Sequence, residues 1–416
     1  MPSTTPLSMA PQDGRLLPPD PIFPMMGGTI FPTRDSITLC LYLPKDLNCS
    51  RVHVSFRMRV IADGELATMM RQNRYTNVRV LHASGEVIDY GLAFRHWDRL
   101  NFDADVTENE GRPCVLLTIM HANGLQLDLT KPQFKTDALP TTPLLGGATL
   151  TQLVAARRLG MGYVLTAPEG QTVMIDGGRD TDVTQIEELL LERGGHVSDW
   201  FLTHYHSDHI GALIELLKKD SDIRIDHLYY DFDCDPAILE QYGGREATCI
   251  TALEEAIAAS GKVGCVVKAC KGLCVERGGL RIKALNNAYW GNFSEICNDS
   301  SVVYKVETPQ ESILFLGDLY TWGSVLLEDP DFLEEVRQCM IVQMAHHGQE
   351  GVDEHFYREL TAMRICLYPA QQWLFDCDKG EGLGSGLWES LNTRAWIRET
   401  DVRKSYSMID GRVTLQ

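Results

Sequence analysis

The run that decides the fold is Thr203-His204-Tyr205-His206-Ser207-Asp208-His209. His204 and His206 are two residues apart, so in an extended loop their rings point the same way and can hold one ion together. Asp208 and His209 come at the first turn of the next segment and can face a second ion. Imidazole and carboxylate ligands without thiolate suit a borderline or hard divalent ion. An ion with an open position in such a site makes hydroxide from water near neutral pH. The run therefore predicts a metal site for two ions.

The surroundings of the run separate it from a chance cluster of histidines. A strand-like stretch, residues 199–202, precedes it, and an apolar-periodic helix is predicted over residues 210–219. A lone histidine is more often an ordinary core or surface residue. The full H-x-H-x-D-H pattern between a strand and a helix has the structural context that a functional motif requires.

This pattern resembles the signature of the metallo-β-lactamase-fold hydrolases. Three further stretches resemble motifs of that family in the expected order: Met174-Ile175-Asp176-Gly177-Gly178, Ile313-Leu314-Phe315-Leu316-Gly317-Asp318 and Ile341-Val342-Gln343-Met344-Ala345-His346-His347-Gly348. The resemblance covers about two thirds of the chain, from near residue 145 to the last residue. It implies an α/β fold, the αββα sandwich, in which two sheets lie face to face between helices with the metals at one edge. The His-His-Gly form is similar to the hydrolase domain of bacterial DNA-uptake (competence) channel proteins and to their soluble stand-alone relatives.

The resemblance also implies a ligand set for each ion. Asp318 follows the strand that is similar to the one presenting the family's bridging aspartate, so it is expected to bind both ions. The first ion is expected to bind His204, His206 and Asp318. The second ion is expected to bind Asp208, His209, Asp318 and His346.

One departure from the family concerns the first ion. Most members with two ions have another metal histidine between the H-x-H-x-D-H run and the bridging aspartate. Here that interval holds only His227, which comes too soon after the motif helix to match. The expected position is occupied by Cys297-Asn298-Asp299-Ser300-Ser301, which is similar to the competence-type branch. Water, Asn298 or Ser300 is expected to complete the shell of the first ion.

Further roles are expected next to the ions. Asp208 is expected to be catalytic as well as a ligand, because its loss damages the site of the activated water. Asp176 is expected to orient a metal histidine or the motif loop. Its alternative is a turn residue, since Asp-Gly-Gly is a good turn sequence. Adjacent histidines that leave a strand point to different sides. Only one of them is therefore expected to be a ligand. His346 is expected to be that ligand, because it follows the apolar strand directly, and His347 is expected to donate to a substrate oxyanion, with an exchange of these two roles as the alternative.

Composition limits the class of protein. The chain has 416 residues, of which 44% are hydrophobic and 23% charged, as is typical of a globular protein long enough for two domains. No apolar run reaches the ~18 residues of a transmembrane helix, so the membrane-channel portion of the competence proteins is not expected. The formal net charge of −19 repels the nucleic-acid backbone and anionic membranes.

Three segments are expected along the chain. Residues 1–24 are rich in Pro and Ser, do not read as a secretory signal and are expected to be a flexible tail. Residues 25–140 hold short β-branched runs that predict a β-sandwich-like domain. Residues 141–416 alternate strands and helices and are expected to form the hydrolase domain. Within that domain, residues 406–415 predict a β-hairpin with an Asp-Gly turn.

The twelve cysteines are scattered, and no C-x-x-C motif occurs. Without an export signal, reduced buried thiols and a cytoplasmic location are expected. A structural zinc on Cys265, Cys270 and Cys274 is the alternative, although the second thiol pair that such a site needs is missing.

Together these observations predict a metal-dependent hydrolase that cleaves a phosphodiester or another small ester through a metal-bound hydroxide. One or two zinc ions are expected, with manganese or iron as alternatives. One alternative function is a competence-type nuclease, which the acidic charge disfavours. Another is a non-catalytic relative that keeps the fold for binding, which the intact motif and Asp318 disfavour. A small-molecule substrate is expected, no membrane partner is expected, and nucleic acid is a disfavoured partner.

Overall fold

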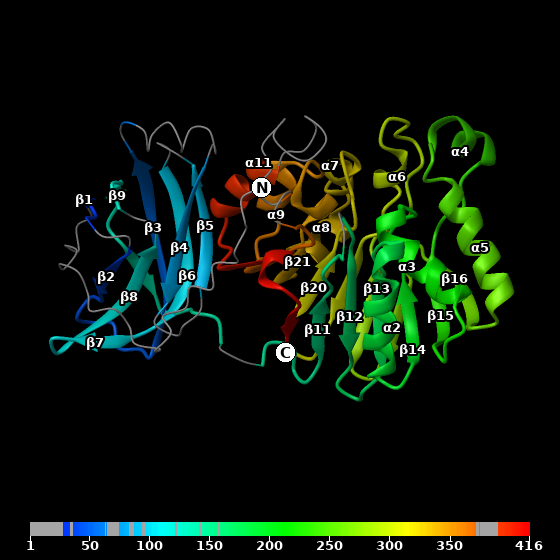
Figure 1. Cartoon of the computed structure of the whole chain (residues 1–416), viewed down its shortest axis with the longest axis horizontal. Coiled ribbons are helices and arrows are strands. Elements are labelled where there is room, and N and C mark those ends of the chain that lie inside the picture. The colour runs from blue at the N-terminus through cyan, green and yellow to red at the C-terminus, as the bar shows by residue number, and fades with distance from the viewer. Residues whose placement is uncertain are drawn as a thin grey trace, which may run out of the picture. The chain divides into compact units, whose positions relative to one another are not determined.

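A computed structural model divides the chain into two compact units, Met1–Leu139 and Pro140–Gln416 (Figure 1). The structure describes residues 28–33, 36–62, 64, 75–82, 87–93, 97–120, 123–140, 143–156, 159–371, 374 and 390–416. The predicted tail, residues 1–24, lies outside these residues. We call the two parts the N-terminal unit and the C-terminal unit.

In its described residues, the N-terminal unit has two antiparallel sheets that share one core. One has the order β1-β9-β3-β10 with β6 also paired to β3, and the other has the order β2-β8-β4-β5 with β7 paired to β8. Side chains of both sheets, such as Leu39 and Val54, are buried in the same hydrophobic cluster. This confirms the β-rich region predicted before the hydrolase domain. The strands are β1 (Gly28–Ile30), β2 (Ser36–Tyr42), β3 (Arg51–Ile61), β4 (Tyr75–His82), β5 (Val87–Ala93), β6 (Trp97–Asp105), β7 (Thr107–Asn109), β8 (Arg112–Met120), β9 (Gln126–Leu129) and β10 (Gln133–Lys135).

The C-terminal unit contains two seven-stranded sheets among its described residues. The first, which we call sheet C, has the order β16-β15-β14-β13-β12-β11-β24, and the second, sheet D, has the order β17-β18-β19-β20-β21-β22-β23. Sheet C consists of β11 (Thr149–Gln152), β12 (Gly162–Thr166), β13 (Thr172–Asp176), β14 (His196–Phe201), β15 (Arg224–Tyr230), β16 (Val263–Lys268) and β24 (Val413–Leu415). Sheet D consists of β17 (Cys274–Arg277), β18 (Leu280–Ala284), β19 (Tyr304–Glu307), β20 (Ser312–Phe315), β21 (Ile341–Gln343), β22 (Ile365–Tyr368) and β23 (Lys404–Ser407).

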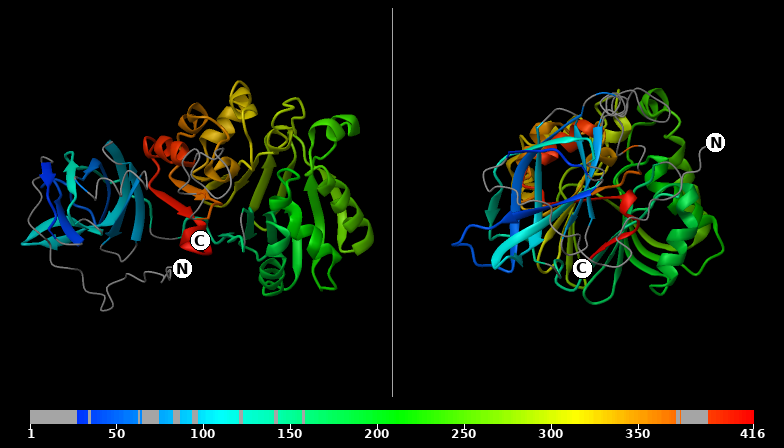
Figure 2. Two further views of the ribbon diagram at one scale, coloured as in Figure 1. Left: turned by 45° about the horizontal axis from the view of Figure 1, so that its top comes forward. Right: turned by 60° about the vertical axis from the view of Figure 1, so that its left-hand side comes forward.

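Helices cover the outer face of each sheet, which gives the predicted αββα order of layers (Figure 2). On sheet C they are α2 (Val183–Leu191), α3 (Ser207–Lys218) and α5 (Thr248–Ser260), with α4 (Pro236–Tyr242) beside α5. The segments after β18 add α6 (Ile296–Asp299), α7 (Trp322–Leu326), α8 (Pro330–Arg337), α9 (Glu354–Glu359) and α11 (Ser390–Arg398). Short 3-10 turns are η1 (Asp180–Asp182), η2 (Ala345–Gly348) and η3 (Met408–Asp410). Within the described ranges, no helix has the length and apolar character needed to span a membrane.

The strands that lead to the predicted motifs are buried and parallel. β13 pairs in parallel with β14 in sheet C, and β20 pairs in parallel with β21 in sheet D. All five residues of β13 are buried, as expected for a strand covered on both faces. The carboxyl ends of parallel strands in such a sheet are where α/β proteins place their ligands.

The predicted hairpin over residues 406–415 is wrong. β23 adds in parallel to β22 in sheet D, whereas β24 pairs antiparallel with β11 in sheet C. The turn between them, at Asp410 and Gly411, connects two sheets instead of two neighbouring strands. The Asp410 carboxylate accepts a hydrogen bond from the Ser407 backbone N at 2.7 Å, and Gly411 has a φ of 78°. Turn residues between two apolar runs reveal the turn but not the partner of either strand.

Candidate metal centre

The motif residues reach one place from both sheets. The chain leaves β14 at Phe201, passes through residues 202–206 and enters α3, whose N-cap residue is His206. Asp318 follows β20 of sheet D, and residues 344–347 follow β21. Residues from several strand ends therefore meet at one edge of the two sheets.

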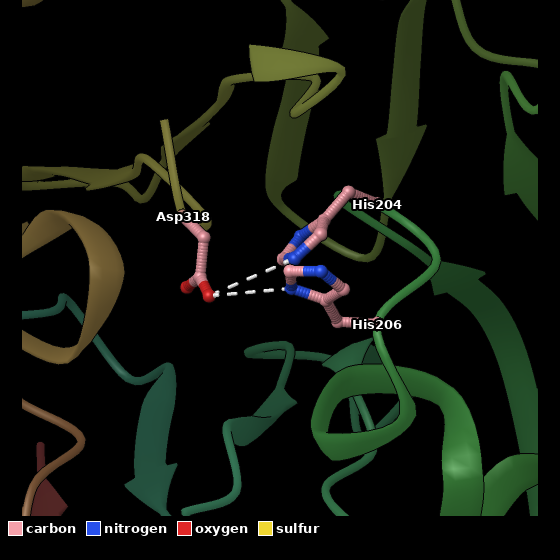
Figure 3. A group of neighbouring side chains, drawn as sticks. All are labelled: His204, His206 and Asp318. Carbon is pink, nitrogen blue, oxygen red and sulfur yellow. Dashed lines mark ion pairs between the residues drawn. The ribbon is translucent and has the colours of Figure 1, made fainter. Parts of the chain in front are cut away.

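The first candidate ligand group contains His204, His206 and Asp318 (Figure 3). The Oδ2 atom of Asp318 lies 3.6 Å from Nε2 of His204 and 4.0 Å from Nδ1 of His206. One ligand atom from each residue lies within 4.8 Å of the others. His204 and Asp318 are buried, and His206 is partly exposed. The three residues predicted for the first ion thus converge on one point.

The second candidate ligand group contains Asp208, His209 and His347, all buried. The Nε2 atom of His347 lies 3.4 Å from Oδ2 of Asp208 and 3.7 Å from Oδ2 of Asp318. The Nε2 atom of His209 lies 3.1 Å from Oδ1 of Asp318. Asp318 therefore stands between the two groups, at the position of a shared carboxylate.

Four polar atoms that face this space have no hydrogen-bond partner. They are buried, and they belong to four of the candidate ligands: Nε2 of His204, Nε2 of His209, Nε2 of His347 and Oδ1 of Asp318. Buried polar atoms in proteins are almost always hydrogen-bonded, so a cluster of exceptions needs an explanation. Nitrogen and carboxylate oxygen are donors that zinc, manganese and iron accept. The residues therefore fit divalent metal ions.

Outer contacts fix the orientation of the imidazole rings. Nδ1 of His209 donates to the Asp176 carboxylate at 2.8 Å, and Nδ1 of His347 donates to the backbone O of Pro369 at 2.8 Å. Asp176 is itself held by the backbone N and the hydroxyl of Thr203, at 2.8 and 2.7 Å. In the neutral ring, a donating Nδ1 carries the only proton, so Nε2 is available as a metal ligand.

The surroundings lower the pKa values of His204 and Asp318, which favours their ligand forms, and raise those of His206 and His209, whose extra proton a bound ion would displace. Burial, and then the neighbouring His209, hold the pKa of His204 well below its usual range, so the ring is neutral. Burial alone would raise the pKa of Asp318, but His209 and the other rings around it hold that pKa well below its usual range. Burial likewise opposes the charged form of His206, yet hydrogen bonds with Asp318 and Cys297 raise its pKa to about 10. Asp318 is therefore an ionised carboxylate surrounded by imidazoles.

His346 and His347 are placed differently from the prediction. His347, which is predicted to face the substrate, lies in the second ligand group, and His346, which is predicted to bind the metal, does not. The prediction requires the chain to continue as a strand. Instead it turns into η2, and both histidines have left-handed backbones, with φ values of 48° and 60°. His346 is 20% exposed, and its Nε2 lies 3.9 Å from Oδ2 of Asp318.

The residues predicted to replace the third histidine of the first ion do not enter either group. Asn298 donates to Glu295 at 2.9 Å, and its buried Oδ1 has no hydrogen-bond partner. Ser300 donates to the backbone O of Cys297 at 2.7 Å. It is the next residue, Ser301, whose hydroxyl contacts the loop of Asp318, by accepting from the Asp318 backbone N at 3.1 Å.

Other expectations concern residues farther away. His227 lies in β15 with its Nδ1 3.3 Å from the backbone O of Ser198, and it belongs to neither ligand group. Cys265, Cys270 and Cys274 are free, and within the described ranges they form no candidate metal group.

Two contacts of the site carry no sequence signal. Arg179 comes directly after the Asp-Gly-Gly turn, and its Nη2 lies 3.6 Å from Oδ2 of Asp208. The thiol of Cys297 lies 2.9 Å from the hydroxyl of Tyr205, the residue between the two motif histidines. Neither residue has the spacing of a known motif, so only the folded chain brings them to the site.

Comparison with known families agrees with this geometry. Residues 157–244, which include the complete H-x-H-x-D-H run, match the family model of the metallo-beta-lactamase superfamily. The C-terminal unit therefore has the metallo-β-lactamase fold. The matched region contains four residues of the two candidate ligand groups, His204, His206, Asp208 and His209. No curated protein matches the sequence at a significant level.

Solved structures with a similar fold include several metallo-β-lactamase-superfamily proteins. The metallo-beta-lactamase fold protein YhfI from Bacillus subtilis is 11% identical, with a TM-score of 0.41, and the match covers 65% of this chain and 99% of YhfI. MEM-A1, a subclass B3 metallo-beta-lactamase from a soil metagenome library, is 16% identical, with a TM-score of 0.32 and coverage of 49% and 78%. Zn(2+)-bound PqqB from Methylobacterium extorquens is 11% identical, with a TM-score of 0.30 and coverage of 47% and 71%.

Proposed function

We propose that the protein is a metal-dependent hydrolase that cleaves a phosphodiester or another small ester. The proposal rests on one observation: buried Nε2 atoms of His204, His209 and His347 face the Asp318 carboxylate without hydrogen-bond partners. His204, His206 and Asp318 would hold one divalent ion. Asp208, His209 and His347 would hold a second ion, with Asp318 shared between the two.

The ions and the protein have separate tasks in this proposal. Bound divalent ions lower the pKa of a coordinated water and polarise an ester or phosphoryl oxygen. The protein keeps Asp318 ionised and turns the Nε2 atoms of His209 and His347 inward, through Asp176 and the Pro369 carbonyl. Zinc is the proposed metal, because the donor set is imidazole and carboxylate, with manganese and iron as alternatives.

His346 is the histidine that we propose faces the substrate. Its Nδ1 donates to the backbone O of Glu350, which leaves the Nε2 lone pair toward the side of Asp318. Burial lowers the pKa of His346, so the ring is neutral. A neutral ring with a free Nε2 can accept a proton from water or substrate. The oxyanion contact predicted for His347 is not proposed, because that ring is buried in the second ligand group.

The charge of the chain supports a small substrate over nucleic acid. Proteins that bind DNA use clustered Lys and Arg to neutralise phosphates, whereas this chain has a formal net charge of −19. Arg179, the cation next to the second ligand group, is already close to Asp208. The experiment must therefore distinguish a hydrolase of small esters from a competence-type nuclease.

A reducing, cytoplasmic location is proposed on the state of the thiols. Every cysteine in the described part of the chain is free. Free buried thiols are typical of proteins from reducing compartments.

The test compares ester substrates with nucleic acid. Protein loaded with zinc or manganese is assayed on bis(p-nitrophenyl) phosphate, on carboxylic esters and on single- and double-stranded DNA, beside Asp318→Ala. We expect metal-dependent turnover of small esters that is lost in the variant, and weak DNA binding even at low salt. Efficient DNA cleavage that is lost in Asp318→Ala would assign a nuclease instead. No turnover of any of these substrates by metal-loaded protein would assign a binding role.

A further inference from the structure

Gln343 is the last residue of β21, and its side chain is completely buried. Its Oε1 accepts hydrogen bonds from the backbone N of Leu316 at 2.7 Å and of Gly317 at 2.8 Å. Its Nε2 donates to the backbone O of Gly317 at 3.0 Å and of Met344 at 2.6 Å. One amide thus uses two donors and two acceptor positions, which is its full capacity. All four bonds end on the backbone.

These bonds lie where two paired strands separate. β20 and β21 are in register as far as Phe315 and Gln343. Beyond that point one chain continues to Asp318 and the other to His347, so the ladder between them ends. Buried backbone groups that lose ladder partners destabilise a protein unless something else satisfies them. The Gln343 side chain replaces the missing ladder bonds between the two diverging chains.

The peptide that Gln343 holds is the one that carries Asp318. Both the N and the O of Gly317 bind the Gln343 amide, and the next backbone N, that of Asp318, donates to Ser301 at 3.1 Å. The Gly317 carbonyl also accepts from the backbone N of His346 at 3.0 Å. Gly317 thereby connects the loop of Asp318 to the turn that contains His347.

We propose that Gln343 is a positioning residue of the metal centre, which sets the separation between Asp318 and His347. It acts through the backbone and touches neither metal nor substrate. The inference rests on the ligand roles proposed for Asp318 and His347. Loss of the amide should weaken the second ion most, because that ion would be held by both chains that Gln343 connects.

A matched control exists in Gln152 of β11, which is 1% exposed. Its Oε1 accepts from the Tyr163 hydroxyl at 3.0 Å, and its Nε2 donates to the Tyr368 backbone O at 3.4 Å. Both glutamines connect buried parts of the C-terminal unit, but Gln152 binds no residue of the ligand loops. Gln152→Leu therefore reports the cost of removing a buried amide without disturbing those loops.

The experiment is a cobalt(II) titration of metal-free protein, followed by the visible absorption of the bound ion and by thermal unfolding. Outer contacts of metal ligands typically change metal affinity by about 10- to 100-fold. We expect Gln343→Leu to weaken the second equivalent of cobalt to that extent and to change its absorption spectrum. Gln152→Leu should lower the melting temperature and leave the titration and the spectrum as in the wild type.

Gln343→Glu is the second variant, because it fills the same volume and keeps both acceptor bonds while losing donors to Gly317 and Met344. We expect it to weaken the second equivalent as well, because a carboxylate oxygen would then face the carbonyl oxygens of Gly317 and Met344 that the amide nitrogen binds. Suppose that the wild type binds two equivalents of cobalt and that both Gln343 variants bind cobalt as Gln152→Leu does. That result overturns this inference and leaves the proposed function standing. A wild type that binds no cobalt overturns the proposed function and this inference with it.

Discussion

The Asp176 carboxylate accepts a hydrogen bond at 2.8 Å from Nδ1 of His209, whose other ring nitrogen faces Asp318 at 3.1 Å. A buried residue at the end of β13 thus orients a candidate metal ligand at the start of α3. Burial raises the pKa of Asp176, while His209 and Thr203 oppose that shift. This hydrogen bond links the Asp-Gly-Gly motif to the H-x-H-x-D-H motif. Asp176 and His209 are 33 residues apart in the sequence.

Removal of this contact should impair metal binding more than folding. We expect Asp176→Asn to lower affinity for the second ion by about 10- to 100-fold, as is typical when a contact that orients a metal histidine is lost. Asp199→Asn is the control, because Asp199 is also fully buried but accepts from the Tyr229 hydroxyl, away from the ligands. Isothermal titration with zinc measures both variants, and equal affinities for them would refute the orienting role.

Metal content is the most direct check of the two ligand groups. We expect elemental analysis to find up to two divalent ions per chain, and chelation to lower the melting temperature because ions that bind only the folded state stabilise it. The ion at His204 and His206 should leave first, since that group offers three ligands, whereas the second group offers Asp208, His209 and His347 together with the shared Asp318. Reconstituted protein that retains no ion would contradict the proposed centre.

The two adjacent histidines should separate binding from turnover. His347→Ala should reduce the metal content, because His347 belongs to the second ligand group. His346→Ala should keep the metal content and lower kcat by ~10²-fold or more, as expected for loss of a proton acceptor. Metal content and kcat, measured on the same preparations of both variants, show which histidine binds the metal and which acts in turnover. A loss of metal in His346→Ala alone would restore the assignment made from the sequence.

Gly317 should tolerate no side chain. It has a φ of 59°, and an added Cβ would lie 2.8 Å from Cβ of Thr203 and 2.9 Å from Oγ of Ser301. Gly261 has a φ of 63° and open space around an added Cβ. Both alanine variants should lose ~1–2 kcal/mol for the left-handed backbone, and Gly317→Ala a further ~1–3 kcal/mol for overpacking. Urea unfolding measures the free energy of unfolding of both variants. Equal losses for Gly317→Ala and Gly261→Ala would show that an added Cβ at Gly317 meets no close neighbour.

The pH dependence of stability should reveal the partly buried ion pairs that Glu335 of α8 makes with Lys283 and Lys305. Burial alone would raise the pKa of Glu335, but hydrogen bonds from Lys283 and Lys305, at 2.8 and 2.6 Å, lower it below its ordinary 4.5. A carboxyl with a lowered pKa in the folded state stabilises the fold above its unfolded pKa, and this stabilisation is lost as the pH falls through the folded pKa. Glu335→Gln should therefore be less stable than wild type at pH 7. The difference in stability should disappear below about pH 4.

The melting temperatures of wild type and Glu335→Gln, measured over a range of pH with a chelator present, check this prediction without interference from metal loss. Glu354→Gln is the control, since the pair of Glu354 with Arg358 is exposed on α9 and exposed pairs contribute little. A difference in melting temperature between Glu335→Gln and wild type that stays constant with pH would contradict a stabilising role of the ionised Glu335.

The sequence contains the parts of the centre that are local. His204, His206, Asp208 and His209 are spaced by one loop and one helical turn, so their pattern is visible without the fold. Asp318 is recognisable because a continuous apolar strand precedes it. His346 and His347 are not separable, because their facing depends on two left-handed backbones in succession, which no residue type near them signals.

Residues that act through the backbone are equally hidden in the sequence. Gln343 is the polar last residue of an apolar strand, and its burial with four backbone hydrogen bonds has no sign in the sequence. Ser301 and Ser300 are adjacent and chemically identical, and only the path of the chain after α6 decides which of them meets Asp318. Such choices depend on tertiary packing, so pattern and spacing do not contain them.

The pairing of β24 with β11 has a consequence for the order of folding. Thr414 meets Thr151 across 263 residues of chain, so sheet C keeps an open edge at β11 until residues 413–415 have left the ribosome. Long-range pairings of this kind slow folding, and an open strand edge invites contact with other nascent chains. We expect the C-terminal unit to complete its folding only once residues 413–415 are available to pair with β11.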